Sequence, residues 1–133
     1  MSGTQVITTL LINAAAVTAV APATRIKAGV LPLNTAIPAI SVSQISSNPV
    51  NLIRLNEANR MHMERVQVTA FHSTYPGLKS LMKLVLAACP SQRGTINTVV
   101  VDSIAPQSEG PEFYDHEAGI YSCSRDFMVR YTE

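Results

Sequence analysis

The segment that follows Phe113 constrains the fold of this chain more than any other part of it. Asp115, Glu117 and Gly119 form a cluster typical of a turn, and an alternating pattern then runs to the end of the sequence. One face of this pattern holds Tyr121, Cys123, Phe127, Val129 and Tyr131, and the other holds Ser122, Ser124, Asp126, Met128 and Arg130. Since successive strand side chains point to opposite sides of a sheet, the pattern predicts a long final strand. Such a strand needs partner strands, so we expect the chain to build a sheet.

Three further segments, 39–45, 60–71 and 96–104, combine alternation or β-branched residues and are predicted to be strands. A short strand over 25–30 is also expected. Segment 60–71 is the strongest of these, because one face is apolar and the other polar. The first face carries Val66, Val68 and Ala70, and the second carries Arg65, Gln67 and Thr69.

Met61 and Met63 are apolar residues on the face of segment 60–71 that is otherwise polar. The parity of the pattern therefore changes near Glu64. Such a change is typical of a β-bulge or of a strand that exchanges partners. We expect an irregularity in the strand at this residue.

Two patterns with helical spacing predict helices. The first begins with the capping-box residues Ser2 and Gln5 and continues as far as Pro22. The second begins at Thr74, a candidate cap, and Pro76 suits its first turn. The apolar stripes are Ile7, Leu10, Leu11, Ala14 and Val17 in the first helix and Leu78, Leu81, Met82, Val85 and Cys89 in the second.

The predicted elements follow the order α-β-β-β-α-β-β, with loops over 46–59 and 105–112. This order predicts an α+β fold, a mostly antiparallel β-sheet with two helices packed on one face. At 133 residues the chain is expected to form a single domain over 1–133.

The surface of this domain is expected to carry little charge. Only 14% of the residues are charged, against roughly 25% in a typical domain. The net charge of +1 gives no strong field that would point to a nucleic-acid or membrane partner. Sparse charge fits a subunit that covers part of its surface with partners, and it fits equally a compact domain with a surface rich in Ser, Thr and Asn.

The apolar run 10–21 has two interpretations. It ends in small residues, as a signal-peptidase site does, but residues 1–9 contain no Lys or Arg. The run is also shorter than the roughly 18–20 apolar residues that cross a bilayer. We predict a buried helix, and a secreted domain cleaved after the 19–21 region is the alternative.

The titratable side chains form no catalytic motif. Asp115, His116 and Glu117 are the densest cluster, but adjacent strand residues point to opposite faces, so a turn role is favoured. His62 and His72 lack the spacing of known zinc motifs. No catalytic residue, cofactor site or metal site is assigned, and a small metal-dependent enzyme that uses these residues is kept as an alternative.

The two cysteines, Cys89 and Cys123, lie far apart in the sequence, one near a predicted helix end and one in the final strand. Two cysteines in a chain of this length do not make a disulfide framework. We expect both thiols to be reduced and buried.

Three segments taken together resemble a known family. They are 37–46, then 65–71 leading into the helix over 78–88, then 114–121 followed by 126–131. Their order and spacing resemble the small minor-tail or tail-completion proteins of long-tailed bacteriophages, which are similar to tail terminators. The resemblance spans most of the chain.

The resemblance implies a structural virion protein with no enzymatic activity and no cofactor. Such subunits form a ring, typically a hexamer, at the head-proximal end of the tail tube, where the ring stops tube growth and joins tail to head. The implied partners are other copies of the chain, the tail tube protein and the head-completion or connector protein, while DNA passes through the lumen without sequence-specific binding. The implied location is the host cytoplasm before assembly and the head–tail junction of the virion afterwards. A head-closure or connector protein of the same junction is the alternative.

Two sets of residues are candidates for contacts in such a ring. The candidate subunit or tube interface is Leu52, Ile53, Leu55, Met61, Met63, Met128 and Tyr131. The candidate basic residues of the lumen are Arg54, Arg60 and Arg93. Several of these residues fall in the predicted loop 46–59, and long loops in small domains are usually functional or mobile.

Overall fold

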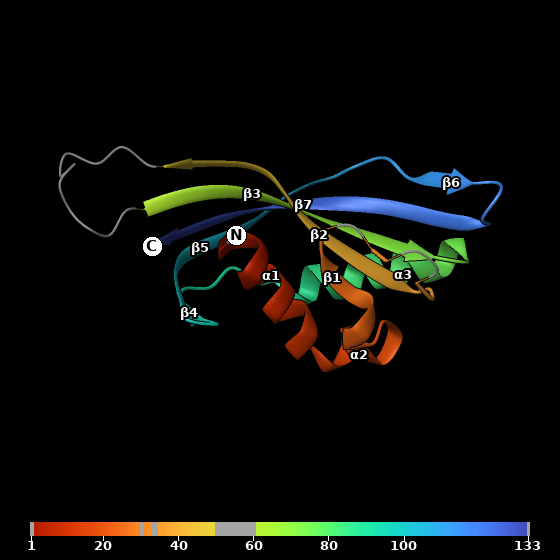
Figure 1. Ribbon diagram of the computed structural model, residues 1–133, viewed down its shortest axis with the longest axis horizontal. Coiled ribbons are helices and arrows are strands. Elements are labelled where there is room, and N and C mark those ends of the chain that lie inside the picture. Colours follow the sequence, from red (N-terminus) through yellow and green to blue (C-terminus); the bar gives the residue numbers. More distant parts are fainter. Residues whose placement is uncertain (1, 30, 33–34, 50–60, 133) are drawn as a thin grey trace.

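The computed structural model describes residues 2–29, 31–32, 35–49 and 61–132 of the chain. Its helices are α1 (Ser2–Asn13), α2 (Ala15–Val20) and α3 (Tyr75–Ala88), and the 3-10 helix η1 (Ala23–Arg25) precedes the first strand. The strands are β1 (Ile26–Ala28), β2 (Ala39–Pro49), β3 (Met61–His72), β4 (Gly94–Ile96), β5 (Val99–Glu109), β6 (Phe113–Asp115) and β7 (Ile120–Thr132). Figure 1 shows the sheet with the helices on one side of it.

The strands form one sheet in the order β1-β2-β3-β7-β5-β4, and β6 pairs with the first residues of β7. β1 runs parallel to β2, and the other described strand pairs are antiparallel. The predicted α+β class is therefore confirmed, although β1 makes the sheet mixed. The predicted order of elements is also confirmed for the main helices and strands, and β4 and β6 are short strands that the sequence pattern did not reveal.

The two longest strands, β3 and β7, form the centre of the sheet. They pair without a break from Met61 opposite Thr132 to His72 opposite Tyr121. The predicted final strand and its two faces are confirmed, because its apolar residues point into the core. The buried residues of the two strands include Val66, Val68, Ala70, Cys123, Phe127, Val129 and Tyr131.

The turn between β6 and β7 is held by its own hydrogen bonds. The Asp115 carboxylate accepts from the backbone N–H groups of Glu117 at 3.0 Å and Ala118 at 3.2 Å. Gly119 has a φ of 68°, a left-handed conformation that glycine adopts without strain. The predicted turn role of Asp115 is thereby confirmed.

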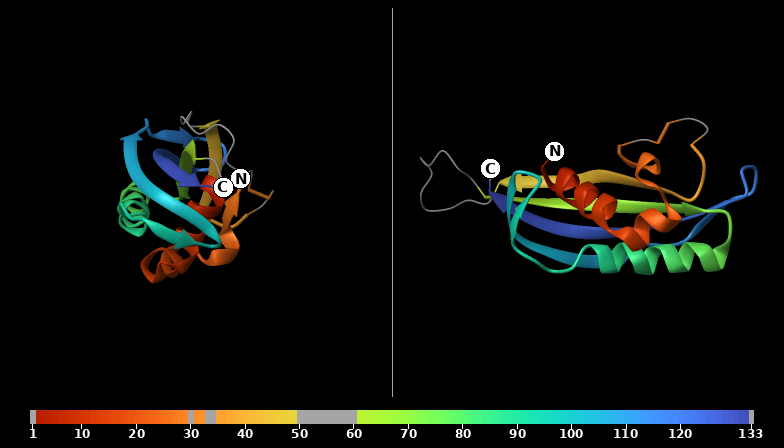
Figure 2. Two further views of the ribbon diagram at one scale, coloured as in Figure 1. Left: turned by 90° about the vertical axis from the view of Figure 1, so that its left-hand side faces the viewer. Right: turned by 90° about the horizontal axis from the view of Figure 1, so that it is seen from below.

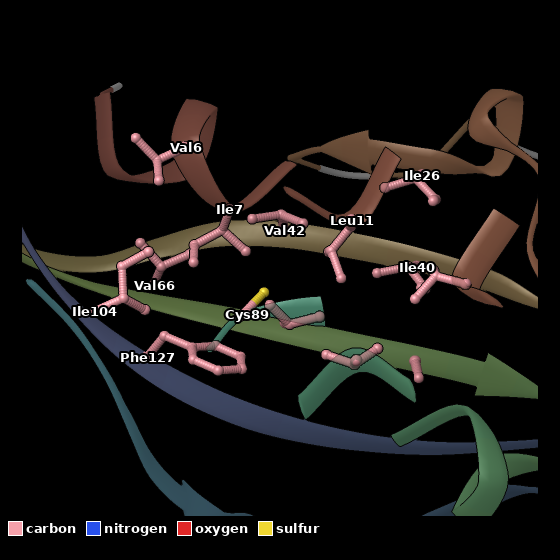
Figure 3. Close-up of a cluster of buried hydrophobic side chains, with 14 of the residues drawn as sticks. Val6, Ile7, Leu11, Ile26, Ile40, Val42, Val66, Cys89, Ile104 and Phe127 are labelled. Carbon is pink, nitrogen blue, oxygen red and sulfur yellow. The ribbon is translucent and has the colours of Figure 1, made fainter. Parts of the chain in front are cut away.

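Helices α1 and α3 cover one face of the sheet, and Figure 2 shows them together on that side. α1 contacts β1, β2, β3 and β7, while α3 contacts β3 and β7. The core between them is largely aliphatic, and Phe127 is its largest fully buried side chain. Figure 3 labels Val6, Ile7, Leu11, Ile26, Ile40, Val42, Val66, Cys89, Ile104 and Phe127 in this core. Burial of each large side chain contributes roughly 1.5–3 kcal/mol, which holds the helices against the sheet.

The predicted first helix is divided into two. Ala14 has an extended backbone with φ −83° and ψ 108°, so α1 ends before it and α2 begins after it. The break allows α2 to contact α3 as well as α1, so tertiary packing overrides the continuous helical pattern. Leu11, Val17 and Ala21 are fully buried whereas Ile12, Ala15, Ala16 and Ala19 are exposed, so only one side of this run faces the core.

The predicted irregularity at Glu64 is wrong. β3 pairs with β7 without any register shift, whereas the register of β2 against β3 shifts around Ile45. The bulge therefore lies in the partner strand. Glu64 occupies the helix-covered face of an unbroken strand, and Met61 and Met63 lie on the opposite face. The apparent parity change reflects a buried acid and half-buried methionines, not a change in the backbone.

Most of the predicted loop 105–112 is strand. β5 continues through Pro106 to Glu109. β4 pairs with β5 only as far as Val101, so the later part of β5 lies at the edge of the sheet. Proline lacks an N–H group, and an edge strand tolerates this loss. β2 likewise extends into the other predicted loop, as far as Pro49.

Thr74 begins α3 as its N-cap, as predicted. Its backbone is extended and its hydroxyl accepts a hydrogen bond from the Gly77 N–H at 3.2 Å. We expect Thr74→Ala to lower the free energy of unfolding by about 1 kcal/mol, because this N–H loses its acceptor. Urea denaturation measures the change. Thr74→Ser keeps the hydroxyl and serves as the control, and an equal loss in both variants would contradict the capping role.

Candidate assembly surface

The sheet face opposite the helices is not covered by any helix of the described residues (Figure 1). We call it the helix-free face. It is formed by the residues of β3 and β7 that alternate with the core residues. They are Met61, Met63, Arg65, Gln67, Thr69 and Phe71 in β3, and Ser122, Ser124, Asp126, Met128, Arg130 and Thr132 in β7. Most are half-buried. An uncovered sheet face leaves room for a second protein.

One end of the helix-free face is polar. Thr69 lies directly opposite Ser124, and their hydroxyl oxygens are 2.9 Å apart. The Nε of Arg65 donates to Asp126 Oδ2 at 2.7 Å, and a second guanidinium nitrogen lies 2.7 Å from the same oxygen. Because this ion pair is partly exposed, it contributes little to stability and mainly fixes the two side chains.

The other end of the helix-free face carries three methionines beside Arg130 and Thr132. Met61 and Met63 lie where β3 begins, and Met128 lies near the end of β7. Met63 is opposite Arg130 and Met128 is opposite Arg65, so Met63 and Met128 are diagonal neighbours across the strand pair. We call these three methionines the methionine patch. Methionine is flexible and polarizable, which suits a contact surface.

The structure brings together three of the predicted interface residues, those of the methionine patch. Tyr131 lies elsewhere, because it is only 2% exposed in the core and its ring stacks on His62 with 5.4 Å between centroids. Arg93 is exposed in the connection between α3 and β4. The other candidates fall outside the described residues: Leu52, Ile53, Arg54, Leu55 and Arg60.

A groove between α3 and the strands β5 and β7 was not predicted. It has a volume of about 380 Å³. Its lining combines cations, one carboxylate and two apolar side chains: Lys79, Met82, Lys83, Leu86, Glu109 and Arg125. We call it the α3 groove. These residues come from three separate elements, so no local pattern in the sequence marks it.

The histidines lie apart from one another in the structure. The ring of His62 stacks on that of Tyr131. His72 Nδ1 accepts a hydrogen bond from the Thr74 N–H at 3.1 Å. His116 packs edge-on against Tyr114. Within the described part of the chain, no group of three or more His, Cys, Asp or Glu residues is placed to hold a metal ion.

Cys89 and Cys123 are free and buried, which confirms the prediction. Burial raises the pKa of Cys89 to about 12. Burial, with Glu109 nearby, also raises the pKa of Cys123. Because the thiolate is the reactive form, we expect neither residue to react with a disulfide reagent at pH 8 in the native protein, and both to react in denaturant. Rapid labelling of either thiol in native buffer would contradict this expectation.

The fold and the helix-free face define a small α+β assembly subunit. Residues 5–132 match the family model described as Tail completion protein gp17. The chain therefore belongs to this family of phage tail completion proteins, and it is a structural component of a virion tail.

A similar fold occurs in a solved structure described as the virion of a native gene transfer agent particle. The match has a TM-score of 0.63 at 13% sequence identity and covers 98% of this chain and 94% of that chain. This likeness shows a shared fold. No significantly similar sequence is found among curated proteins. The helices described above are all too short or too polar to span a membrane.

Proposed function

We propose that this chain forms a hexameric ring at the head-proximal end of the tail tube, where the ring ends tube polymerisation and joins the tail to the head. The helix-free face carries this proposal, since this member of a tail completion family has one side of its sheet that no helix of the described residues covers. The ring acts by binding, without bond chemistry. Residues 1–133 act as one domain in it.

The methionine patch is assigned to the contact with the tail tube protein. It lies where β3 begins, next in sequence to the predicted interface residues Leu52, Ile53 and Leu55. Half-buried methionines leave apolar surface whose removal from water contributes roughly 25 cal/mol per Å². Their flexible side chains adapt to the surface of the last tube subunits. The opposite side of the ring would then meet the head-completion protein.

The predicted basic residues Arg54, Arg60 and Arg93 are assigned to the lumen. Repeated around a hexamer, they would give a positive collar from a chain whose net charge is only +1. Contacts of arginine with phosphate groups carry no sequence information, so DNA would pass without sequence-specific binding. Weak binding of duplex DNA that falls steeply with salt is the expected signature.

The oligomeric state tests the proposal directly. Light scattering and negative-stain images of the purified protein should show a hexameric ring with a central hole, either alone or after purified tail tubes are added. Tubes with a bound ring should no longer elongate when tube protein is supplied. A protein that stays monomeric both with and without tubes overturns the proposal. Binding to head connectors in place of tubes would assign it to head closure.

A pair of variants tests the methionine patch. Met63→Asp places a carboxylate in the patch, and we expect normal folding with loss of tube capping, because an apolar contact is replaced by a charge that must be desolvated against the tube, even with Arg130 opposite. Thr69→Asp adds the same group at the polar end of the helix-free face, away from the pairing of β6 with β7, and should cap tubes as the wild type does. Circular dichroism checks the fold of both variants. Equal capping by the two variants would exclude the patch as the tube contact.

A further inference from the structure

The α3 groove contains donors that lack partners. Arg125 lies 3.7 Å from Glu109, and its Nη1 donates to the Gln107 carbonyl at 3.0 Å. The Nε of Arg125 is nevertheless buried without a hydrogen-bond acceptor. Lys83 has no ion pair with any carboxylate of the described residues. A carboxylate brought into the groove would form charge-assisted hydrogen bonds with Lys83 and with the part of the Arg125 side chain that lines the groove.

The rest of the groove lining is either neutralised or apolar. The Lys79 ammonium lies 3.2 Å from Glu112, and the hydrogen bond to this carboxylate raises the pKa of Lys79. Met82 and Leu86 form an apolar wall, and Leu86 is 37% exposed. The groove therefore fits an occupant that offers an apolar side chain next to a carboxylate.

The β6–β7 hairpin of the same chain offers this combination. Phe113 is 65% exposed, more than any other large hydrophobic side chain of the described residues. Asp115 and Glu117 are exposed acids in the turn that follows it. Figures 1 and 2 show this turn projecting past the helices at one end of the molecule.

The hairpin is also ordered before any partner binds. The Tyr114 ring lies 4.4 Å from the Tyr121 ring and 4.8 Å from the His116 ring, measured between centroids. The Asp115 carboxylate holds the turn through two backbone N–H groups. A preformed element loses little conformational entropy on docking, so its exposed groups can contribute fully to binding.

We propose that the β6–β7 hairpin of one subunit docks into the α3 groove of a second copy of this chain. Glu117 would approach Lys83 and Arg125, and Phe113 would pack on the wall of Met82 and Leu86. The inference rests on the proposed ring and supplies its subunit contact. Two different surfaces of each subunit meet in this contact, which is the head-to-tail arrangement that closes into rings.

The hairpin of the same subunit does not occupy the groove. Its turn projects past the N-terminal end of α3, whereas the groove lies along the later residues Lys79 to Leu86. β6 is also held by its pairing with β7. The groove is therefore left open for the hairpin of a neighbour.

Charge reversal tests the docking in the full chain. Lys83→Glu and Glu117→Lys each place like charges in the contact, and each should weaken self-association by about tenfold or more in sedimentation experiments. Both residues are exposed, so the folds should be unchanged by circular dichroism. Lys27→Glu reverses an exposed charge on β1, away from both surfaces, and should associate as the wild type does.

Mixing the two variants gives the decisive result. Each single variant repels itself, but the groove of the Lys83→Glu variant should accept the hairpin of the Glu117→Lys variant. The unaltered groove of the second variant should likewise accept the unaltered hairpin of the first. An equimolar mixture should therefore recover the ring with the two variants alternating around it, within about threefold of the wild-type affinity. If the ring needs the tube, the same comparison is made on purified tail tubes.

The outcomes separate the two proposals. A wild-type ring that neither reversal weakens overturns the docking and leaves the ring intact as a proposal. If each single variant self-associates weakly and the mixture does not recover the ring, the docking is also overturned. The weaker association would then have another cause. A wild type that is monomeric with and without tubes overturns both. A Lys83→Cys and Glu117→Cys mixture treated with oxidised glutathione provides a second readout, since docking predicts a disulfide between the two variants as the glutathione is reduced.

Discussion

We expect Phe127→Ala to lower the free energy of unfolding by about 3–5 kcal/mol, a large share of the roughly 5–15 kcal/mol typical of a protein domain. Phe127 is fully buried and is the largest such side chain in the core. It lies in β7 directly opposite Val66, in the central strand pair that α1 and α3 cover. Truncation would leave a cavity between the helices and the sheet that this aliphatic core cannot fill. Urea denaturation followed by circular dichroism measures the loss.

Met128→Ala is the matched control for this prediction. Met128 is the next residue in β7 but points to the helix-free face, where it is only half-buried. We expect the free energy of unfolding of this variant to lie within about 1 kcal/mol of the wild-type value, because no packed core surrounds the removed atoms. A loss as large as that of Phe127→Ala would contradict the assignment of the two faces and would mean that this side of the sheet is covered.

The central strands could be predicted because alternation is a strong local signal. In β7 each residue that points to the helix-covered face is apolar apart from Arg125. This alternation of side chains can be recognised without knowledge of any other part of the chain. The same holds for Val66, Val68 and Ala70 in β3. The cap of α3 at Thr74 and the turn at Asp115 are local as well, since each depends on side chains bonding to backbone groups a few residues away.

The features that escaped prediction depend on distant residues. The break at Ala14 exists because α2 packs on α3, and the bulge at Ile45 is a property of the pairing between β2 and β3. The extension of β5 through Pro106 requires that this part of the strand lie at a sheet edge. None of these conditions can be seen within one segment of sequence.

The candidate site was predicted only in part for the same reason. Met61, Met63 and Met128 were named as candidate interface residues, and all three lie on the helix-free face. Tyr131 belongs to the inward face of β7 and is buried accordingly. The α3 groove gave no signal at all, because its cations and apolar wall meet only after α3 packs beside β5 and β7.

Glu64 is the residue whose substitution should stabilise the protein. It is 0% exposed, and neither carboxylate oxygen has a hydrogen-bond partner within the described residues. The carboxylate lies against the start of α1, in space that a side chain at Gly3 would need. The positive end of the helix dipole favours a negative group there, but by only about 0.3–1 kcal/mol in most cases. Burial of an unpartnered carboxylate costs several times more.

We therefore expect Glu64→Met to raise the free energy of unfolding by roughly 1–4 kcal/mol, because a side chain of similar volume replaces a buried carboxyl group without hydrogen-bond partners among the described residues. Glu64→Gln keeps the volume and the polar atoms, so its gain should be smaller, and urea denaturation compares the two. If Glu64→Met is instead less stable than Glu64→Gln, the favourable interaction of a polar side chain with the dipole of α1 outweighs the cost of burying that side chain. Glu64 lies in β3 between Met63 of the methionine patch and Arg65 of the ion pair. If the Glu64→Met variant is more stable but no longer caps tail tubes, Glu64 serves assembly at the expense of stability.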